Sequence, residues 1–362
     1  MQKTFLRAGF VLSLAWVLLC FATAHATPVI IDHNCTDITA IPESAINQAK
    51  STLHIAYGHT SHGSQLTSGM TGLVAFANTG GLGLTLPDNV FAWNNGGAGG
   101  ALDLHDYAMG GDVGYHPDWV DNTRAYLDNP GNADVNVIIW SWCGQVDDKY
   151  RAGTLNSEYL APMAALEAAY PDVNFVYMTG HVDIWDDADN KAANRMIRDF
   201  CMDNDKILYD FADIERYNPD GTYFEYVHDN CDYYDTAPDG TRQGNWAIEW
   251  QNTHTEGMDW YDCSSAHSQA LNANQKAYAA WWLWAALAGW DPDPPADDDD
   301  DDTADDDAGD DDNTDTDTVP DTDDDGKDSP LPPAGGSGGG CFIGTLCWTF
   351  ADTVGANPVF AP

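Results

Sequence analysis

The sequence predicts a three-layer α/β/α sandwich, in which helices cover both faces of a parallel sheet. Two observations lead to this fold class. Short apolar runs that are typical of strands alternate along the chain with longer stretches that have helical periodicity. In addition, 43% of the 362 residues are hydrophobic and 12% are aromatic, which is enough to bury a core on each face of a sheet.

The expected strands and helices follow one another through the middle of the chain. The strands are predicted at residues 53–57, 89–93, 135–142, 173–179 and 206–211. The helices are predicted at residues 64–78, 116–128, 154–170, 187–204 and 272–289, and the last of them is apolar nearly all round. Because parallel strands place their carboxyl ends at one edge of the sheet, we expect ligands to bind at that edge.

The first 26 residues have the pattern of a secretory signal peptide. A basic start is followed by an apolar run from Phe10 to Ala22 and by Ala24-His25-Ala26, which is typical of a cleavage site. We therefore expect residues 1–26 to be removed and the mature protein to be secreted or held at a bacterial cell surface. In an oxidising compartment the cysteines of the body favour disulfides, although their number is odd. These cysteines are Cys35, Cys143, Cys201, Cys231 and Cys263.

Two further segments follow the globular body, which we place at residues 27–295. Residues 296–334 are dominated by Asp and cannot bury a core, which predicts an extended, disordered acidic stalk. Within it, residues 321–328 resemble a calcium loop without its closing glutamate, so the alternatives are weak calcium binding and a solvated acidic run. Residues 335–362 contain a glycine-rich stretch that ends at Cys341 and is similar to bacterial surface-sorting signals. Attachment to the cell envelope through this tail and a free secreted form are the two alternatives.

The formal net charge of −44 limits the partners of the protein. Both the body and the stalk are acidic, so neither offers the basic surface that would neutralise nucleic-acid phosphates. We therefore expect no nucleic-acid partner. The cysteines are widely spaced and form no CxxC motif, so we expect no zinc site, and we expect neither a cofactor nor a resident metal.

Chemically reactive or polar side chains follow the ends of four predicted strands. In chain order these are His59, Ser61 and His62, the loop Asn94-Asn95-Gly96-Gly97, Cys143 and Gln145, and His181 and Asp183. Because the carboxyl ends of parallel strands meet at one edge, we expect these residues to converge there.

The turn that contains Ser61 can carry a nucleophile, and His267 is the natural general base for a serine there. Ser61 lies in YGHTSHGSQ, the turn between the first predicted strand and the first predicted helix. His267 precedes the last predicted helix, so its loop can return to the same edge and take a proton from a serine there. A carboxylate on its second ring nitrogen would fix the tautomer, and Asp262 or Asp259 can supply it.

These motifs resemble those of the SGNH (GDSL-like) hydrolase superfamily over about residues 50–290. The resemblance rests on GHTSHG, a glycine-rich loop some 35 residues later, WSWCGQ, and a terminal acid and histidine followed by ALNANQKAYA. It implies a flavodoxin-like sandwich and a secreted serine esterase that removes acyl groups, such as acetyl groups on a carbohydrate or another small ester. It further implies the catalytic residues Ser61, His267 and Asp262, an oxyanion hole of Ser61, Gly97 and Gln145, and substrate-binding residues His59, His62, His181 and Asp183.

The sequence departs from the superfamily pattern at two positions. Gln145 is the nearest amide donor to the place where the third block of the family has asparagine. Ser264 stands three residues before His267, where the acid belongs, whereas Asp262 is five residues before it. A Ser–His dyad is therefore an alternative to a triad.

Structural roles and other functions stay open as alternatives. Ser61 can cap the helix that follows it, and Cys143 and Cys263 can form a disulfide or offer a thiol nucleophile. Trp246, Trp250 and Trp260 lie in a long connection, residues 212–262, and either stack on sugar rings or pack beneath it. The whole protein can instead be a catalytically silent carbohydrate-binding or surface-display protein. A third alternative is a metal-dependent hydrolase that uses His59, His62, His181 and Asp183.

Overall fold

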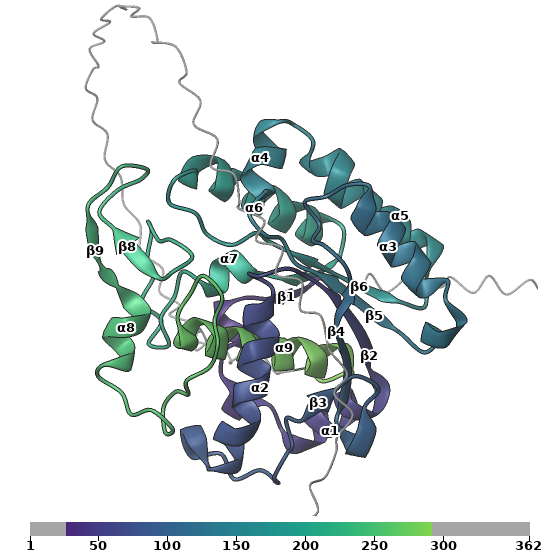
Figure 1. The fold of residues 1–362 in the computed structure, drawn as a ribbon, viewed down its shortest axis with the longest axis horizontal. Helices are drawn as coiled ribbons and strands as arrows, with labels where there is room; N and C mark the ends of the chain where they lie inside the picture. Colours follow the sequence, from purple (N-terminus) through teal and green to yellow (C-terminus); the bar gives the residue numbers. More distant parts are fainter. Residues whose placement is uncertain (1–26, 292–362) are drawn as a thin grey trace, which may run out of the picture. The chain divides into compact units, whose positions relative to one another are not determined.

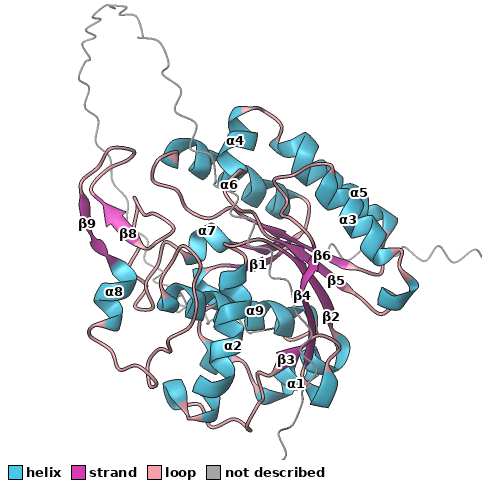
Figure 2. Ribbon diagram, in the orientation of Figure 1, coloured by secondary structure: helices cyan, strands magenta, loops and turns pink. Residues whose placement is uncertain are grey.

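The computed structural model describes residues 27–291. The predicted signal peptide, acidic stalk, calcium-loop motif and carboxyl-terminal tail lie outside these residues. Within them the predicted fold class is confirmed: a parallel, seven-stranded sheet lies between two layers of helices, as Figure 1 shows by chain position and Figure 2 by element type.

The central sheet has the order β1-β7-β6-β5-β2-β4-β3. Its strands are β1 (Val29–Ile31), β2 (His54–Gly58), β3 (Trp93–Asn94), β4 (Leu102–Met109), β5 (Val137–Trp140), β6 (Asn174–Met178) and β7 (Ile207–Tyr209). Five of them, β4-β2-β5-β6-β7, have the flavodoxin-like order, in which the direction of winding reverses between β2 and β5. Ligands of open α/β sheets bind in the crevice at such a reversal, so the place between β2 and β5 is the first candidate for a site.

Each face of the sheet carries its own layer of helices (Figure 1). One layer holds α1 (Glu43–Thr52), α2 (Ser64–Asn78) and α9 (Ala270–Leu287). The other holds α3 (Asp118–Leu127), α4 (Val146–Arg151), α5 (Ala161–Ala169) and α6 (Asp187–Asp203). A π-helical turn, Asn156–Leu160, leads into α5. Shorter 3-10 turns lie at His33–Cys35, Ile38–Ala40, Gly81–Gly83, Ala98–Gly100 and Pro130–Asn132.

The long connection after β7 forms a small extension of its own. It contains α7 (Phe211–Ile214), the antiparallel strands β8 (Asp232–Tyr234) and β9 (Arg242–Asn245), and α8 (Trp246–Gln251). Trp246 and Trp250 are buried in a cluster of this extension, and Trp260 packs against the same cluster. Of the two alternatives for these aromatic residues, the structure therefore supports packing beneath the connection rather than stacking on a sugar.

Helix α9 is buried almost all round, as its apolar sequence indicates. Trp281 and Trp284 have no exposed surface, and the core cluster that they join includes residues of α1, α2 and the sheet. A Cβ atom on Gly69 of α2 would lie 2.1 Å from the carbonyl oxygen of Ala273, so glycine at this position lets the two helices approach closely. This contact fixes α9, and with it the loop that precedes α9, against the helix that follows Ser61.

One predicted strand is wrong, and a longer one was not predicted. Residues 89–92 form a turn, so only Trp93 and Asn94 of the expected strand pair with the sheet. The strand that continues the sheet is β4, where Asp103, His105 and Asp106 interrupt the apolar pattern. The buried carboxylate of Asp103 has polar partners, because it contacts His105 at 3.1 Å and accepts a hydrogen bond at 2.6 Å from the amide of Gly96.

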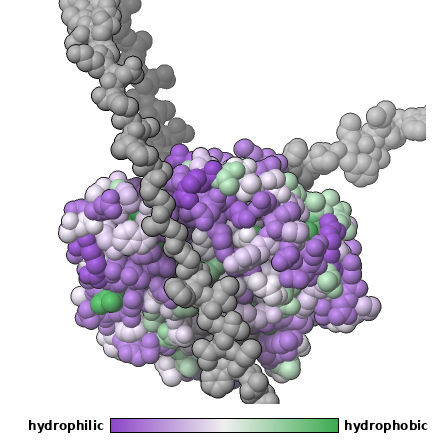
Figure 3. Space-filling view, turned by 45° about the horizontal axis from the view of Figure 1, so that its top comes forward, coloured by the Kyte–Doolittle hydropathy of each residue, from purple (hydrophilic) through white to green (hydrophobic). Residues whose placement is uncertain are grey.

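No helix within residues 27–291 has the length and apolar character that crossing a membrane requires. On the face drawn in Figure 3, the surface of the described residues is mainly hydrophilic, and its apolar areas are small and separate.

Candidate active site

The turn between β2 and α2 brings Ser61 to the carboxyl edge of the sheet. Two glycines are needed here because the turn lies directly on β5. A Cβ atom on Gly58 would lie 2.4 Å from the ring of Trp140, and one on Gly63 would lie 2.3 Å from Oγ of Ser141. Since the winding reverses between β2 and β5, Ser61 stands at the topological switch point of the sheet.

Ser61 contacts His267, as the sequence analysis predicted. Its Oγ lies 3.0 Å from Nε2 of His267, a residue 206 positions later in the chain. The alternative role of Ser61 as a helix cap is not observed, because the residue that precedes α2 is Gly63 and no side chain caps the helix. A serine hydroxyl that is hydrogen-bonded to an imidazole has the partner it needs to act as a nucleophile.

The loop before α9 is held so that the ring of His267 faces Ser61. His267 itself has a φ of +64°, a left-handed conformation that non-glycine residues seldom adopt. The carbonyl of the preceding Ala266 accepts a hydrogen bond from Nε2 of the buried Gln65 at 2.5 Å. On the other side, Oγ of Ser268 accepts one from Nδ2 of Asn272 at 2.7 Å. These bonds tie the strained residue to α2 and α9.

The carboxylate expected beside His267 is not found there. Asp262 is exposed, and within residues 27–291 it forms no hydrogen bond or ion pair with His267. The alternative, Asp259, instead accepts a hydrogen bond from the amide of Thr255 at 2.7 Å. The ring of His267 thus contacts Ser61 but neither Asp262 nor Asp259, which is the pairing that the dyad alternative expects.

Gly97 lies at the opposite edge of the sheet from Ser61. A Cβ atom on Gly97 would lie 3.3 Å from Cβ of Asp103, which pairs with His54, the first residue of β2. The amide of Gly97 also donates to the carbonyl of Asn94 at 3.3 Å. The expectation that Gly97 contributes to an oxyanion hole is therefore wrong. It arose because the strand that reaches the site edge is β4 and not residues 89–93.

Gln145 follows β5 at the site edge, but its side chain has other partners. Its Oε1 accepts a hydrogen bond from the amide of Gly144 at 3.1 Å, and its side chain hydrogen-bonds Asp112. No hydrogen bond joins Gln145 to Ser61 in the described part of the chain. The backbone amide of Ser61 donates to no protein acceptor within residues 27–291 and precedes α2 by three residues, so it is available to a ligand.

His62 adjoins Ser61 in the sequence but contacts different partners. Its Nε2 lies 3.0 Å from Oδ2 of Asp229, and its Nδ1 lies 3.6 Å from Sγ of Cys143. Burial lowers the pKa of His62 to about 3, so its ring is neutral at neutral pH. Burial alone would raise the pKa of Asp229, but the hydrogen bond from His62 and the nearby His228 outweigh it and leave that pKa at about 2. Asp229 is therefore ionised.

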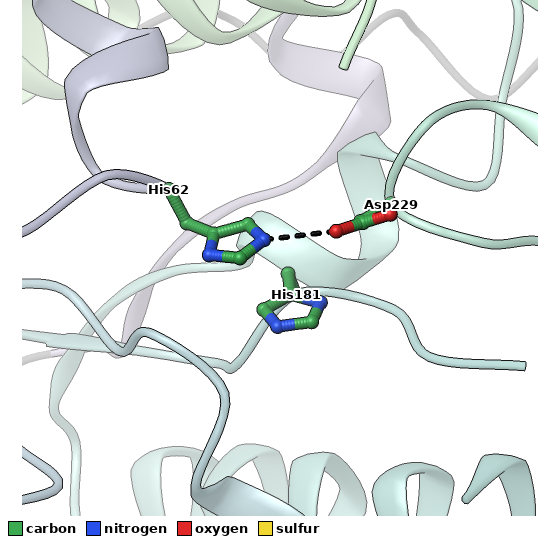
Figure 4. A group of neighbouring side chains, drawn as sticks. All are labelled: His62, His181 and Asp229. Carbon is green, nitrogen blue, oxygen red and sulfur yellow. Dashed lines mark hydrogen bonds and ion pairs between the residues drawn. The ribbon is translucent and has the colours of Figure 1, made fainter. Parts of the chain in front are cut away.

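The ring of His62 also stacks on two other site histidines. Ring centroids lie 3.9 Å apart for His62 and His181 and 4.4 Å apart for His62 and His267, with angles of 7° and 16° between the ring planes. Figure 4 shows His62 pointing to Asp229 with the ring of His181 beside it. The sequence analysis expected His62 and His181 to bind substrate, and the structure places both next to the Ser61–His267 pair.

The donor atoms of His62, His181 and Asp229 lie within 4.8 Å of one another, a spacing compatible with a metal ion. Two features of the group oppose such a role. The lone pair of an imidazole nitrogen lies in the ring plane, so two rings inclined by 7° direct their lone pairs in parallel and not at one point. In addition, Nε2 of the neutral His62 carries the hydrogen that it donates to Asp229. The group fits a hydrogen-bonded stack better than a metal centre.

His59 and Asp183 are not part of this group. The buried His59 contacts Oδ1 of Asp106 through Nε2 at 2.7 Å and the carbonyl of Thr60 through Nδ1 at 2.9 Å. Asp183 accepts a hydrogen bond from the amide of Trp185 at 2.8 Å, which closes a local turn. The four residues considered for a metal-dependent hydrolase are therefore not assembled at one point.

A buried polar network beneath the site was not predicted from the sequence. Lys276 and Glu215 are 0% and 1% exposed, and Nζ of Lys276 lies 2.6 Å from Oε1 of Glu215. Lys276 also contacts Oε1 of Gln65, the residue that holds the carbonyl of Ala266. Oε2 of Glu215 accepts a hydrogen bond from the amide of Val182 at 2.8 Å. The network thus supports the loops of both His267 and His181, and a lysine inside an apolar helix was its only local signal.

No disulfide joins the cysteines of residues 27–291 to one another. Cys143 follows β5 and lies 3.8 Å from Oγ of Ser61. Sγ of Cys263, the partner considered for it, lies 3.8 Å from the carbonyl of Ala270 and accepts a hydrogen bond from Asn274 at 3.4 Å. The expected disulfide between Cys143 and Cys263 is absent because the two thiols face different surroundings.

Exposed aromatic side chains lie near this edge of the sheet, and a pocket lies alongside β4 next to one of them. Tyr107, Tyr115 and Trp185 are 57%, 55% and 56% exposed and lie near or after the ends of β4 and β6. A pocket of about 740 Å³ is lined by Asp106 and Tyr107 among others, and the ring of Tyr107 lies 4.0 Å from that of His59. The pocket does not include Ser61. The candidate site is therefore located by the contact between Ser61 and His267 and not by the position of the pocket.

Comparisons with models of protein families, with curated proteins and with solved structures found no match. The functional interpretation therefore rests on the site geometry, and the resemblance to the SGNH superfamily stays a prediction.

Proposed function

We propose that the protein is a serine esterase that hydrolyses carboxylic esters through Ser61 and His267. The 3.0 Å distance between Oγ of Ser61 and Nε2 of His267 carries this proposal. Two segments far apart in the sequence meet at the switch point of the sheet, and they meet through a nucleophile and a base. The resemblance to SGNH hydrolases supports the same reaction class.

In the proposed reaction, Nε2 of His267 removes the proton of Ser61 while Oγ attacks the carbonyl carbon of the ester. The amide of Ser61 donates to the carbonyl oxygen as it becomes negative. The alcohol then leaves with the proton that His267 had taken, and an acyl group remains on Ser61. A water that is deprotonated by the same imidazole then releases the acid. The scheme uses a dyad, so Asp262 has no part in it.

The proposed substrate is an acyl group, such as acetyl, on a carbohydrate. Tyr107, Tyr115 and Trp185 offer exposed aromatic faces near the site edge, and such faces can pack on the apolar faces of sugar rings. The pocket beside Tyr107 offers space for further sugar units. Because residues 1–26 have the pattern of a signal peptide, we propose that the reaction takes place outside the cell, in secreted or surface-held protein.

The proposal is tested by hydrolysis of p-nitrophenyl acetate and of acetylated xylan by the purified protein. We expect Ser61→Ala and His267→Ala each to lower kcat/KM by about 10³-fold or more. Two matched controls are expected to keep the wild-type rate. They are Ser68→Ala, in the helix that follows the turn, and His254→Ala, in the connection after β7.

Three results would overturn the proposal. Activity that survives Ser61→Ala at the wild-type rate would exclude the serine mechanism. Activity lost with a chelator and restored by a divalent metal would favour a metal-dependent hydrolase. Binding of acetylated xylan without turnover of either ester would favour the silent carbohydrate-binding alternative.

A further inference from the structure

Cys143 lies beside the proposed nucleophile, and its thiol also contacts a histidine. It follows β5, so it occupies the second of the two strand ends that form the switch point. Its Sγ lies 3.6 Å from Nδ1 of His62 and 3.8 Å from Oγ of Ser61. The residue is half-buried, so a small molecule that reaches Ser61 also reaches this thiol.

The tautomer of His62 follows from its second contact. Asp229 is ionised and can only accept, so Nε2 of His62 must carry the hydrogen of the 3.0 Å bond. Nδ1 of the neutral ring is then an acceptor, and Cys143 lies in front of it. Thiol, imidazole and carboxylate stand in the order nucleophile, base and orienting acid.

We propose that Cys143, His62 and Asp229 form a second nucleophilic centre, which accepts an acyl group in thioester linkage from the ester bound at Ser61. The inference rests on the proposed function for the identity of the ester, but the thiol centre is defined by its own contacts.

The step balances without any further reactant. Sγ attacks the carbonyl carbon while the thiol proton passes to Nδ1 of His62, which holds it only until the alcohol leaves because the pKa of the buried ring is about 3. The carbon–oxygen bond to the alcohol then breaks, and the alcohol takes the proton from Nδ1. The products are an acyl thioester on Cys143 and a free alcohol, and His62 returns to its starting tautomer with Nε2 still bonded to Asp229.

The other cysteines of the described residues have no such partners. Burial raises the pKa of the Cys35 thiol to about 11 and those of Cys201, Cys231 and Cys263 to about 12. Cys263 is the best internal control, because it is also half-buried but its sulfur contacts only the carbonyl of Ala270 and the amide of Asn274. A site-specific thiol activity should therefore distinguish Cys143 from Cys263 in a single sample.

The test uses the Ser61→Ala variant, in which the thiol centre is intact. After incubation with p-nitrophenyl acetate, we expect one acetyl group on the peptide that contains Cys143, released by neutral hydroxylamine and absent in Ser61→Ala/Cys143→Ala. His62→Gln and Asp229→Asn, in the Ser61→Ala background, are expected to slow this acetylation by about 10²-fold and about tenfold. Iodoacetamide is expected to label Cys143 at least tenfold faster than Cys263 in wild type and at a similar rate to Cys263 after His62→Gln.

The ratio of Cys143 to Cys263 labelling also identifies variants that fail to fold, because both thiols of an unfolded chain would react at similar rates. Acetylation of other residues, or equal labelling of the two cysteines in the folded wild type, would overturn the inference. Wild-type hydrolysis that depends on Ser61, with no acetyl-Cys143 in Ser61→Ala, would refute the thiol centre and leave the serine esterase intact. Acetyl-Cys143 together with wild-type hydrolysis that survives Ser61→Ala/Cys143→Ala would refute the serine mechanism alone.

Discussion

His267 and His62 stack on each other, yet the chain holds them in opposite ways. His267 is exposed, stands on a left-handed residue, and has Oγ of Ser61 as the partner of its Nε2. His62 is buried, and both of its ring nitrogens have protein partners, Asp229 and Cys143. The exposed ring is reachable by a substrate and free to exchange protons with it. The buried ring of His62 rests in one tautomer, and its Nδ1 faces the thiol of Cys143.

The comparison shows that proximity in the sequence to the proposed nucleophile does not identify its base. His62 is the sequence neighbour of Ser61, and His267 is 206 positions away, but the turn directs the Ser61 hydroxyl to the distant ring. The buried carboxylate also belongs to His62 rather than to His267. A comparison of variants at the two rings therefore separates the two proposed roles.

The largest expected difference is in ester hydrolysis. His267→Gln is expected to lower kcat/KM for p-nitrophenyl acetate by about 10³-fold because it removes the base. His62→Gln is expected to lower it by about tenfold, because it removes only a ring that stacks on the base. Steady-state rates of both variants at one pH measure the contrast, with circular dichroism to show that each is folded. Equal losses would mean that the two rings act as one unit.

The support beneath the two rings is expected to matter for stability. Glu215→Gln removes the charge that faces the buried Lys276, whose pKa burial already lowers and Glu215 partly restores. We expect the free energy of unfolding to fall by about 3 kcal/mol, as when one partner of a buried ion pair is lost. Urea unfolding measures it. Glu158→Gln is the matched control, because Glu158 pairs with Lys149 at 2.5 Å with side chains 28% and 22% exposed, and surface pairs contribute at most about 1 kcal/mol.

The buried ring of His62 is expected to make the free energy of unfolding depend on pH in acid. The pKa of His62 lies at about 3 in the folded protein, below the value of about 6.5 in an unfolded chain, so between these values the unfolded state binds a proton that the folded state does not. Stability from this residue is complete above about pH 6.5 and is lost as the pH falls towards 3. Urea unfolding at several pH values is expected to show a slope in wild type that is up to about 1.4 kcal/mol per pH unit steeper than in His62→Gln. A wild-type slope retained by His62→Gln would contradict the burial argument, and His254→Gln serves as the control variant.

Sequence reasoning went furthest where the pattern is local. The periodicity of residues 64–78 predicted α2 to the residue, and the order of strands and helices gave the fold class. The pair Ser61 and His267 was also predictable, because each lies directly beside a recognisable strand or helix. Because β4 contains polar residues, its sequence did not show the pattern of a strand. Residues 89–93 were predicted as the strand instead, and Gly97 was therefore placed at the wrong edge of the sheet.

The rest of the site depends on contacts between distant segments. Asp229 lies in an irregular connection without any motif, and only the fold brings it to His62, 167 positions away. Gln65, Lys276 and Glu215 look like ordinary helix and turn residues until tertiary packing buries them together. Such partners have no local signal, because a carboxylate or an amide can reach a ring from any loop that packs beside it.

The smallest expected effect concerns the acid that the sequence placed beside His267. Asp262→Asn is expected to change kcat/KM for p-nitrophenyl acetate by no more than about twofold, or about 0.4 kcal/mol, because its exposed side chain makes no contact with the imidazole. Steady-state rates of Asp262→Asn and Asp229→Asn, measured together, test this. A loss of about 10²-fold in Asp262→Asn alone would show that the loop before α9 closes into a triad when substrate binds, and the dyad would then describe only the protein without substrate. A loss confined to Asp229→Asn would show instead that the buried carboxylate acts on the base through the ring of His62, which lies between the two.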